Sequence, residues 1–164
     1  FDRMKKVHGL GSRERLLLQI AVILHGCGKY ISLSDPADCS YQIIMATEII
    51  GLSRKEREII AYAVKFNTME FPYYEELSRE TDLDRSEYLT VAKLTAILRV
   101  ANACDRSHKQ KFENVKVSLK ENELIIQVDT PEDIILEMGL FAEKAAFFEE
   151  VFSIRTSIHQ KKRM

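Results

Sequence analysis

The spacing of apolar residues changes once along the chain, near residue 109, and this change restricts the folds that the chain can adopt. Up to that point apolar residues recur every three or four positions, which is typical of packed helices. Beyond it, Val115, Val117 and Leu119 alternate with polar residues, and the segment 124–128 follows a four-residue turn at 120–123, which indicates a hairpin. We predict a mainly α fold, with a helical domain over residues 1–108 and a small α+β domain over residues 109–164.

The end residues of the first helices predict where these helices begin. Ser12 can cap a helix whose residues 16–24 are apolar on every side except at Gln19, and such a helix is expected at the centre of a domain. Ser53 and Glu56 form a capping box, in which each side chain accepts a hydrogen bond from a backbone N–H at the helix start. We therefore expect helices that begin near residues 12 and 53.

A long helix and the second region complete the expected order of elements. Asp84 and Glu87 mark the start of a helix that we expect to run to about Arg106. Residues 141–152 return to helical spacing, and residues 154–158 alternate again, which predicts one more helix and a third strand. The second region buries little apolar surface by itself, so we expect it to pack against the helical part.

The charge balance excludes two broad classes of partner. Lys and Arg together number 24, Asp and Glu number 25, and the formal net charge is -1. No global field therefore favours nucleic acid or an anionic membrane surface, so any anion site has to be local. Apolar runs such as residues 20–24 are far too short to span a bilayer. We expect neither nucleic acid nor a membrane as a partner.

The cysteines and the first residues indicate the cellular setting. Cys27, Cys39 and Cys104 are an odd number without a CxxC pair, which is typical of reduced thiols in a cytoplasm. No signal-peptide pattern follows Phe1, and residues 1–7 already have helical spacing. We therefore expect a cytoplasmic protein, and we interpret the chain as a fragment of a longer one.

One histidine lies where a metal ligand could be placed. His25 ends the apolar helix, and Asp35, Asp38 and Cys39 follow it in the sequence. A catalytic metal usually needs three or more protein ligands that converge on one point, and no pair of these residues has a recognised ligand spacing. The alternative is a helix-terminal histidine that hydrogen-bonds a neighbouring backbone carbonyl. A soft zinc cluster is a further hypothesis, with these ligands: His25, Cys27, Cys39 and Cys104.

Polar residues form a stripe on the otherwise apolar long helix. Thr95, Arg99, Asn102 and Arg106 are spaced by four, three and four residues, so we expect them to share one face. Two arginines on one face suit phosphate oxygens, which guanidinium groups bind in a bidentate manner. Pairing with carboxylates on neighbouring helices is the alternative.

Basic residues gather where the long helix meets the second region. This basic junction consists of Arg106, His108, Lys109 and Lys111. A cluster of positive charge at this place could extend a phosphate path that begins at Arg99, because guanidinium and ammonium groups both bind phosphate. A solvated hinge without a ligand is the alternative.

Three segments carry a resemblance to a known family. They read HGLGSRERLLLQIAVILHGCGKYI, SYQIIMATEIIGLSRKEREIIAYAVKF and VAKLTAILRVANACDRSHKQ, and they occur in this order over most of residues 1–112. Together they resemble the C-terminal half of the exopolyphosphatase / guanosine pentaphosphate phosphohydrolase (Ppx/GppA) family. A weaker resemblance continues through LEMGLFAEKAAFFEEVF.

The resemblance implies that the two halves of a longer protein have different functions. In that family an N-terminal pair of actin-like domains hydrolyses terminal phosphates with a divalent cation, expected to be Mg²⁺. The C-terminal half is a helical domain related to the His-Asp metal phosphohydrolases, followed by a small α+β domain. It is credited with holding the polyanion and with dimerisation. By resemblance, this chain has no catalytic residue, metal or cofactor of its own. Its implied partners are polyphosphate or a phosphorylated guanine nucleotide, the N-terminal catalytic half and a second copy.

The ligand positions of the related metal site are mostly replaced in this chain. Where relatives tend to have a His-Asp pair, this chain has His25 and Gly26, and Asn67 and Asn102 stand where relatives often have a histidine and an aspartate. We interpret the metal site as degenerate. A metal-dependent phosphohydrolase of the His-Asp type and a purely structural interaction domain are the alternatives. The expected ligand-binding residues are His25, Arg99, Arg106, Lys109 and Lys111.

Overall fold

The structure, a computed structural model, describes residues 1–161 and divides into two compact units. One unit is formed by Leu10–Leu98, and the other by Phe1–Gly9 together with Arg99–Met164. The predicted fold class is confirmed, because a mainly helical region is followed by a small α+β part. The predicted domain boundary between residues 108 and 109 stays a prediction. No helix within residues 1–161 is long and apolar enough to cross a membrane.

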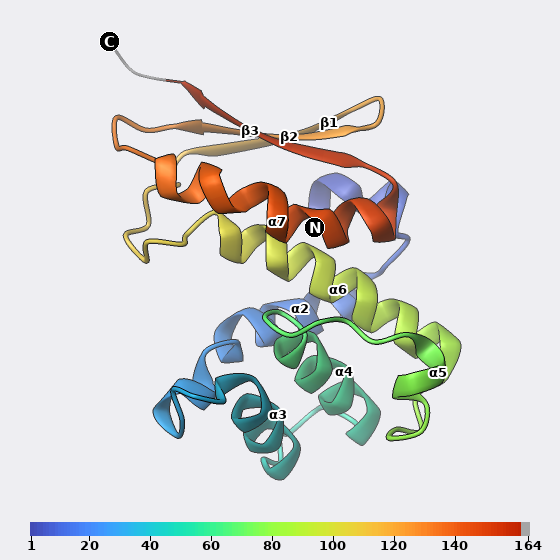
Figure 1. The fold of residues 1–164 in the computed structure, drawn as a ribbon. Helices are drawn as coiled ribbons and strands as arrows, with labels where there is room; N and C mark the ends of the chain where they lie inside the picture. Colours follow the sequence, from blue (N-terminus) through green and yellow to red (C-terminus); the bar gives the residue numbers. More distant parts are fainter. Residues whose placement is uncertain (162–164) are drawn as a thin grey trace. The chain divides into compact units, whose positions relative to one another are not determined.

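Helices alone build the unit of residues 10–98. The central one is α4, which buries six consecutive residues, 59–64, and contacts both α2 and α3 (Figure 1). Six apolar neighbours in a row cannot all face one side of a helix, so α4 is surrounded by packed chain. In chain order the elements are α2 (Ser12–Leu24), the 3-10 helix η2 (Cys27–Tyr30), α3 (Pro36–Ala46), α4 (Arg54–Lys65), α5 (Tyr74–Leu77) and α6 (Arg85–Ala103), whose last residues belong to the other unit.

The expectation that the apolar helix after residue 12 would be central is wrong. α2 buries Leu17, Leu18 and Ala21, but Val22 and Ile23 on its last turn are 46% and 78% exposed. Its first residue is Ser12 and its N-cap is Gly11, so Ser12 does not cap it. Some apolar residues of α2 are therefore buried where α2 packs against α4, and others lie on an exposed surface.

Both predicted N-terminal signatures of later helices are confirmed. At the start of α4 the hydroxyl of Ser53 accepts the Glu56 N–H at 3.2 Å, and the Glu56 carboxylate accepts the Ser53 N–H at 2.7 Å. At the start of α6 the carboxylates of Asp84 and Glu87 accept each other's backbone N–H in the same way, at 2.9 and 2.8 Å. Each cap satisfies N–H groups that have no partner inside the helix, which anchors the first turn.

A three-stranded sheet and one long helix organise the other unit. β1 (Val115–Lys120) pairs antiparallel with β2 (Glu123–Asp129), and β2 pairs parallel with β3 (Arg155–Lys161). α7 (Ile135–Phe152) connects β2 to β3 and lies along one face of the sheet (Figure 1). The short elements η1 (Asp2–Met4) and α1 (Lys5–His8) belong to the same unit, and η1 contacts β1.

Alternation along β2 divides the sheet into a covered and an uncovered face. Leu124, Ile126 and Val128 are buried, whereas the residues between them are half-buried or exposed. From α7, Phe141 and Phe148 are buried as well, and α7 contacts β3. A sheet with one packed face and one solvated face explains this alternation.

The three predicted strands are confirmed, with two differences in the segments between them. The hairpin turn comprises only residues 121 and 122 rather than four residues, and Glu121 adopts a left-handed φ of 47° there. α7 begins at Ile135, six residues before the predicted start at 141. Its first turn is fixed by Asp133, whose carboxylate accepts the Ile135 N–H at 2.9 Å.

Candidate functional site

His25 lies at the C-terminal end of α2 and makes a local hydrogen bond. Its Nδ1 lies 2.6 Å from the carbonyl oxygen of Val22, so Nδ1 carries the proton and donates it. This geometry corresponds to the alternative that the sequence left open, a helix-terminal histidine bound to a backbone carbonyl. In the neutral imidazole only Nε2 then keeps a lone pair for an external ligand.

Two glycines follow His25 and have different surroundings. A Cβ atom at Gly28 would collide with Pro36 O and would lie 2.5 Å from Ser40 N. The Gly28 N–H donates to the Ser40 hydroxyl at 2.9 Å, and this hydroxyl donates to Pro36 O at 2.8 Å. Around Gly26, in contrast, a Cβ atom would meet nothing within 4 Å. Gly28 is therefore needed for close packing of η2 on α3, whereas Gly26 is not.

The acidic and thiol side chains that follow His25 do not assemble a ligand set. The carboxylate of Asp38 pairs with Lys65 Nζ at 2.6 Å, and Asn67 is buried, with 2% of its surface exposed. Throughout residues 1–161, no three His, Cys, Asp or Glu side chains lie together in a group that could hold a metal ion. Within the described part of the chain, these side chains therefore do not assemble the three or more protein ligands that a catalytic metal needs. The absence of a bound metal stays a prediction.

Cys104 is a poor zinc ligand in its present environment. It lies just after α6, and burial raises the pKa of its thiol to about 12, with Asp105 and Glu137 adding to the effect. Because the thiolate is the form that binds zinc, a thiol with such a high pKa disfavours the metal. Cys27 and Cys39 belong to the other unit. The structure gives the proposed cluster of His25 and the three cysteines no support.

Arg99 packs against an aromatic ring of its own unit. Its guanidinium carbon lies 4.6 Å from the centre of the Phe147 ring on α7, a cation–π arrangement. Burial lowers the pKa of Arg99, and the nearby charge of Glu150 opposes that effect. The surroundings of Arg99 therefore favour an internal role, in which the guanidinium packs on an aromatic ring, over phosphate binding.

The expectation that Arg99 and Arg106 share a helix face is wrong, because the helix is shorter than expected. α6 ends at Ala103, and the segment after it forms turns. The Asp105 carboxylate accepts the Gln110 N–H at 2.9 Å, and the Glu137 carboxylate accepts the Ser107 N–H at 3.0 Å. These side chains provide acceptors for backbone N–H groups after the helix, so the chain can turn there.

Glu137 and Lys111 form the anchor of the basic junction. Glu137 is 1% exposed, and its carboxylate lies 3.2 Å from Lys111 Nζ, which also donates to the Asp133 carbonyl. Burial by itself raises the pKa of Glu137, but hydrogen bonds from Ser107 and Lys111 outweigh burial and bring the pKa to about 2. Glu137 is therefore ionised at neutral pH, and the ion pair holds the junction to α7.

The five expected ligand-binding residues thus have different surroundings. Arg106 and Lys109 are exposed, whereas Lys111 is engaged with Glu137 and Arg99 packs on Phe147. These four residues belong to the unit that holds the sheet, and His25 belongs to the other unit. At the junction, Arg106 and Lys109 are the two members of the expected set that present their charge to solvent.

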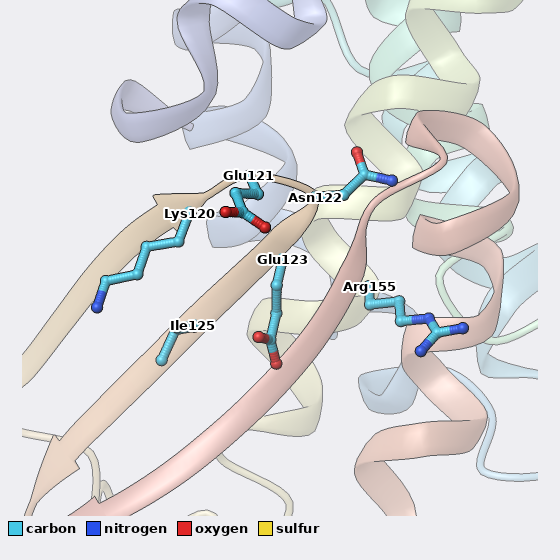
Figure 2. Close-up of a pocket in the computed structure, with 6 residues that line it drawn as sticks. All are labelled: Lys120, Glu121, Asn122, Glu123, Ile125 and Arg155. Atoms are coloured by element: carbon cyan, nitrogen blue, oxygen red, sulfur yellow. The ribbon is translucent and has the colours of Figure 1, made fainter.

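Sequence reasoning missed further basic residues, which lie on the uncovered face of the sheet. They are Lys116, Lys120, Arg155 and Lys161, and all four are exposed. A hollow of about 620 Å³ lies among Lys120, Glu123 and Arg155, which come from three different strands (Figure 2). The alternation of Lys116 and Lys120 with Val117 and Leu119 was a visible signal, but only the strand register shows that Arg155 and Lys161 of β3 lie on the same face of the sheet, on the other side of β2.

The arrangement of elements defines a class of protein: a mainly helical domain followed by a small α+β part, with exposed basic residues in the unit that holds the sheet. Comparison with protein families matches residues 1–144 to the Ppx/GppA phosphatase family, domain III. The chain therefore belongs to the Ppx/GppA phosphatase family, as the resemblance in its sequence predicted. A search of curated proteins found no match.

Proposed function

We propose that the chain is a non-catalytic C-terminal module of an exopolyphosphatase-type phosphatase. It binds polyphosphate or a phosphorylated guanine nucleotide and supports dimerisation of the enzyme. The observation that carries the proposal is the match of residues 1–144 to domain III of the Ppx/GppA phosphatases. An N-terminal catalytic half, dependent on Mg²⁺, performs the hydrolysis in this proposal. The setting we propose is the cytoplasm, where the three free cysteines stay reduced.

Local positive charge supports the binding part of the proposal. The chain has a formal net charge of -1, so its overall charge does not attract a polyanion. Arg106 and Lys109 nevertheless place two exposed cations close together in sequence, and the Lys111–Glu137 pair anchors the segment that carries them. An anchored segment loses less conformational entropy when it binds than a mobile one, so its charges are available at lower cost.

The donor atoms around His25 support the non-catalytic part. His25 offers one ring nitrogen, Asp38 is paired with Lys65, and Asn67 is a neutral amide. A hydrolytic metal centre of the His-Asp type needs several anionic or imidazole ligands on one ion. These residues fit such a centre poorly, so we assign no reaction step to them.

Exposed apolar side chains support the association part. Ile23 at the end of α2 and three residues at or just after η2 are between 71% and 92% exposed: Tyr30, Ile31 and Leu33 at 92%, 71% and 85%. All four lie within residues 23–33, and large apolar surface that is exposed in this way marks sites where protein partners dock. In this proposal a second copy of the chain covers part of this surface.

The test combines retention of polyphosphate with an assay of its hydrolysis. The purified chain is mixed with long-chain polyphosphate and separated by size, and phosphate release is measured with Mg²⁺, Mn²⁺ or Zn²⁺ added. We expect polyphosphate to co-elute with the protein and no phosphate to be released with any of the metals. Metal-dependent release would establish the His-Asp hydrolase alternative. Failure to co-elute at low salt would leave only the structural alternative.

A further inference from the structure

The uncovered face of the three-stranded sheet carries an excess of positive charge. Because side chains alternate along a strand, the burial of Leu124, Ile126 and Val128 on one face assigns residues 123, 125, 127 and 129 to the other. The strand register then places their partners on the same face. These partners are Lys116, Ser118 and Lys120 from β1 and Arg155, Ser157, His159 and Lys161 from β3.

Cross-strand rows distribute the charges over all three strands. One row joins Lys120, Glu123 and Arg155, and another joins Lys116, Gln127 and His159. The face holds four Lys or Arg side chains, Lys116, Lys120, Arg155 and Lys161, against two carboxylates, Glu123 and Asp129. The ion pairs among the described residues include none of these four cations. The positive excess is therefore presented to solvent on a chain that is nearly neutral overall.

The surface between these side chains is shallow and continuous. One hollow of about 620 Å³ is bordered by two cations, Lys120 and Arg155, and by two carboxylates, Glu121 and Glu123 (Figure 2), so the positive excess lies on the face as a whole rather than in this hollow. A second hollow, of about 460 Å³, shares Lys120 and Ile125 with the first and extends to Lys161. Such an open surface does not surround a small ligand on several sides. It therefore suits an extended ligand better than a compact one.

The spacing of the cations favours a long ligand. Adjacent strands lie about 5 Å apart and residues advance about 3.4 Å along a strand, so β1 and β3 are about 10 Å apart. Lys116 and Lys120 are separated by about 13 Å on the same estimate. A single phosphate group cannot contact all four cations over such distances, whereas a chain of linked phosphates can.

The chemistry of the face favours a phosphate chain over single-stranded nucleic acid. Proteins that bind single strands stack the bases on aromatic side chains, which contribute much of the affinity. None of the three strands contains Phe, Tyr or Trp, and the centre of the face is Ile125 between Ser118 and Ser157. The face therefore offers charge but no Phe, Tyr or Trp ring on which bases could stack, and this favours a ligand without bases.

We propose that this face, with Lys116, Lys120, Arg155 and Lys161, binds the inorganic polyphosphate chain. The inference rests on the proposed function and names the surface that performs it. β1 begins four residues after Lys111, so the row of Lys116 is the part of the face closest in sequence to the basic junction.

The experiment compares three double variants of the 164-residue chain with the unchanged chain. Lys120→Ala/Arg155→Ala removes two cations of the face, Arg106→Ala/Lys109→Ala removes two of the junction, and Arg54→Ala/Arg79→Ala removes two exposed cations of the helical unit as a charge-matched control. Long-chain polyphosphate and a single-stranded RNA of similar total charge are titrated into each protein, and thermal melts check that each variant folds. Amide chemical shifts of the unchanged chain are recorded with and without polyphosphate.

We expect the face variant to bind polyphosphate at least tenfold more weakly, while the control keeps its affinity. Shift changes should concentrate on residues 116–120 and 155–161. Equal affinity of the face variant and the control, with weaker binding only for the junction variant, would overturn the inference and leave the proposed function intact. RNA bound as tightly as polyphosphate, with the same loss in the face variant, would overturn the assignment of the ligand. No binding of polyphosphate by the unchanged chain would overturn the proposed function itself.

Discussion

Gly26 and Gly28 are two residues apart, yet only one of them is required by the structure. The backbone of Gly28 touches the start of α3, where Pro36 O and the Ser40 hydroxyl leave no room for a side chain. Gly26 has a φ of -112°, and a Cβ atom there would meet nothing within 4 Å, so a residue other than glycine or proline can adopt its conformation. In the motif with two glycines after His25, only the second glycine is therefore required for packing.

Alanine at these two positions provides a matched pair. We expect Gly28→Ala to lower the free energy of unfolding by about 1–3 kcal/mol, because the new methyl group meets backbone atoms that cannot move aside. Gly26→Ala should change it by less than about 0.5 kcal/mol. Urea unfolding of both variants measures the difference. Equal stability of the two variants would contradict the close packing of η2 on α3.

Glu137 makes the stability of its unit depend on pH. Its pKa of about 2 in the folded chain lies below the ordinary value of 4.5, so its contribution is complete above pH 4.5 and is lost as the pH falls toward 2. That difference corresponds to roughly 3 kcal/mol at neutral pH. We expect Glu137→Gln to lower the free energy of unfolding at pH 7, and the gap to the unchanged chain to narrow below pH 4.5.

The control for Glu137→Gln lies on the same helix. Glu143→Gln removes a carboxylate whose side chain is 73% exposed, and we expect little effect at any pH. Urea unfolding at a series of pH values from 3 to 7 gives both curves. A gap between Glu137→Gln and the unchanged chain that stays constant over this range would show that the charge of Glu137 does not stabilise the fold.

At the scale of the element, helix starts were predictable from sequence and one helix end was not. The capping boxes of α4 and α6 are local, since both partners of each bond lie within four residues. α6 ends at Ala103 without a glycine or proline to mark the place. Its exit is instead held by Glu137, which is far away in sequence and binds Ser107 N–H. A tertiary contact of this kind leaves no local signal.

The end of α6 separates two arginines that the sequence placed together, and their roles should separate too. We expect Arg99→Ala to lower the free energy of unfolding by roughly 1–2 kcal/mol, because it removes the contact with Phe147. Arg106→Ala should leave the melting temperature unchanged and weaken polyphosphate binding roughly two- to fivefold, as for one exposed charge contact. Thermal melts and titrations of both variants measure this. If Arg99→Ala instead weakened polyphosphate binding and left the free energy of unfolding unchanged, Arg99 would be a ligand-binding residue and this prediction would be wrong.

At the scale of the whole molecule, the second region should not fold alone. The unit that contains the sheet also includes residues 1–9 and 99–108, and η1 contacts β1. A piece comprising residues 109–164 lacks Met4, which is 2% exposed, and the Ser107 partner of Glu137. We expect this piece to give no cooperative thermal transition, because too little apolar surface remains to offset the ordering entropy. A dispersed NMR spectrum and a cooperative melt would contradict this.

The candidate site was predictable in part, and the limit has a physical cause. Charge clusters that are continuous in sequence, such as residues 106–111, can be found by inspection. The basic face of the sheet could not be found in this way, because Arg155 lies 35 positions from Lys120 and joins it only through the register of β2 with β3. Sequence alone predicted the hairpin of the first two strands and a third strand, but it did not predict which strand the third one pairs with. The residues that share the uncovered face could therefore not be identified.

The central claim is that this chain holds a polyphosphate chain through several local cationic contacts. Calorimetric titration of the 164-residue chain with long-chain polyphosphate and with pyrophosphate, each at low and at high salt, tests the claim most directly. We predict tight binding of the long chain at low salt, at least tenfold weaker binding of pyrophosphate, and a steep loss of affinity for the long chain at high salt, because salt screens exposed charges. Equal affinity for both ligands, or an affinity for the long chain that does not change with salt, would contradict the account.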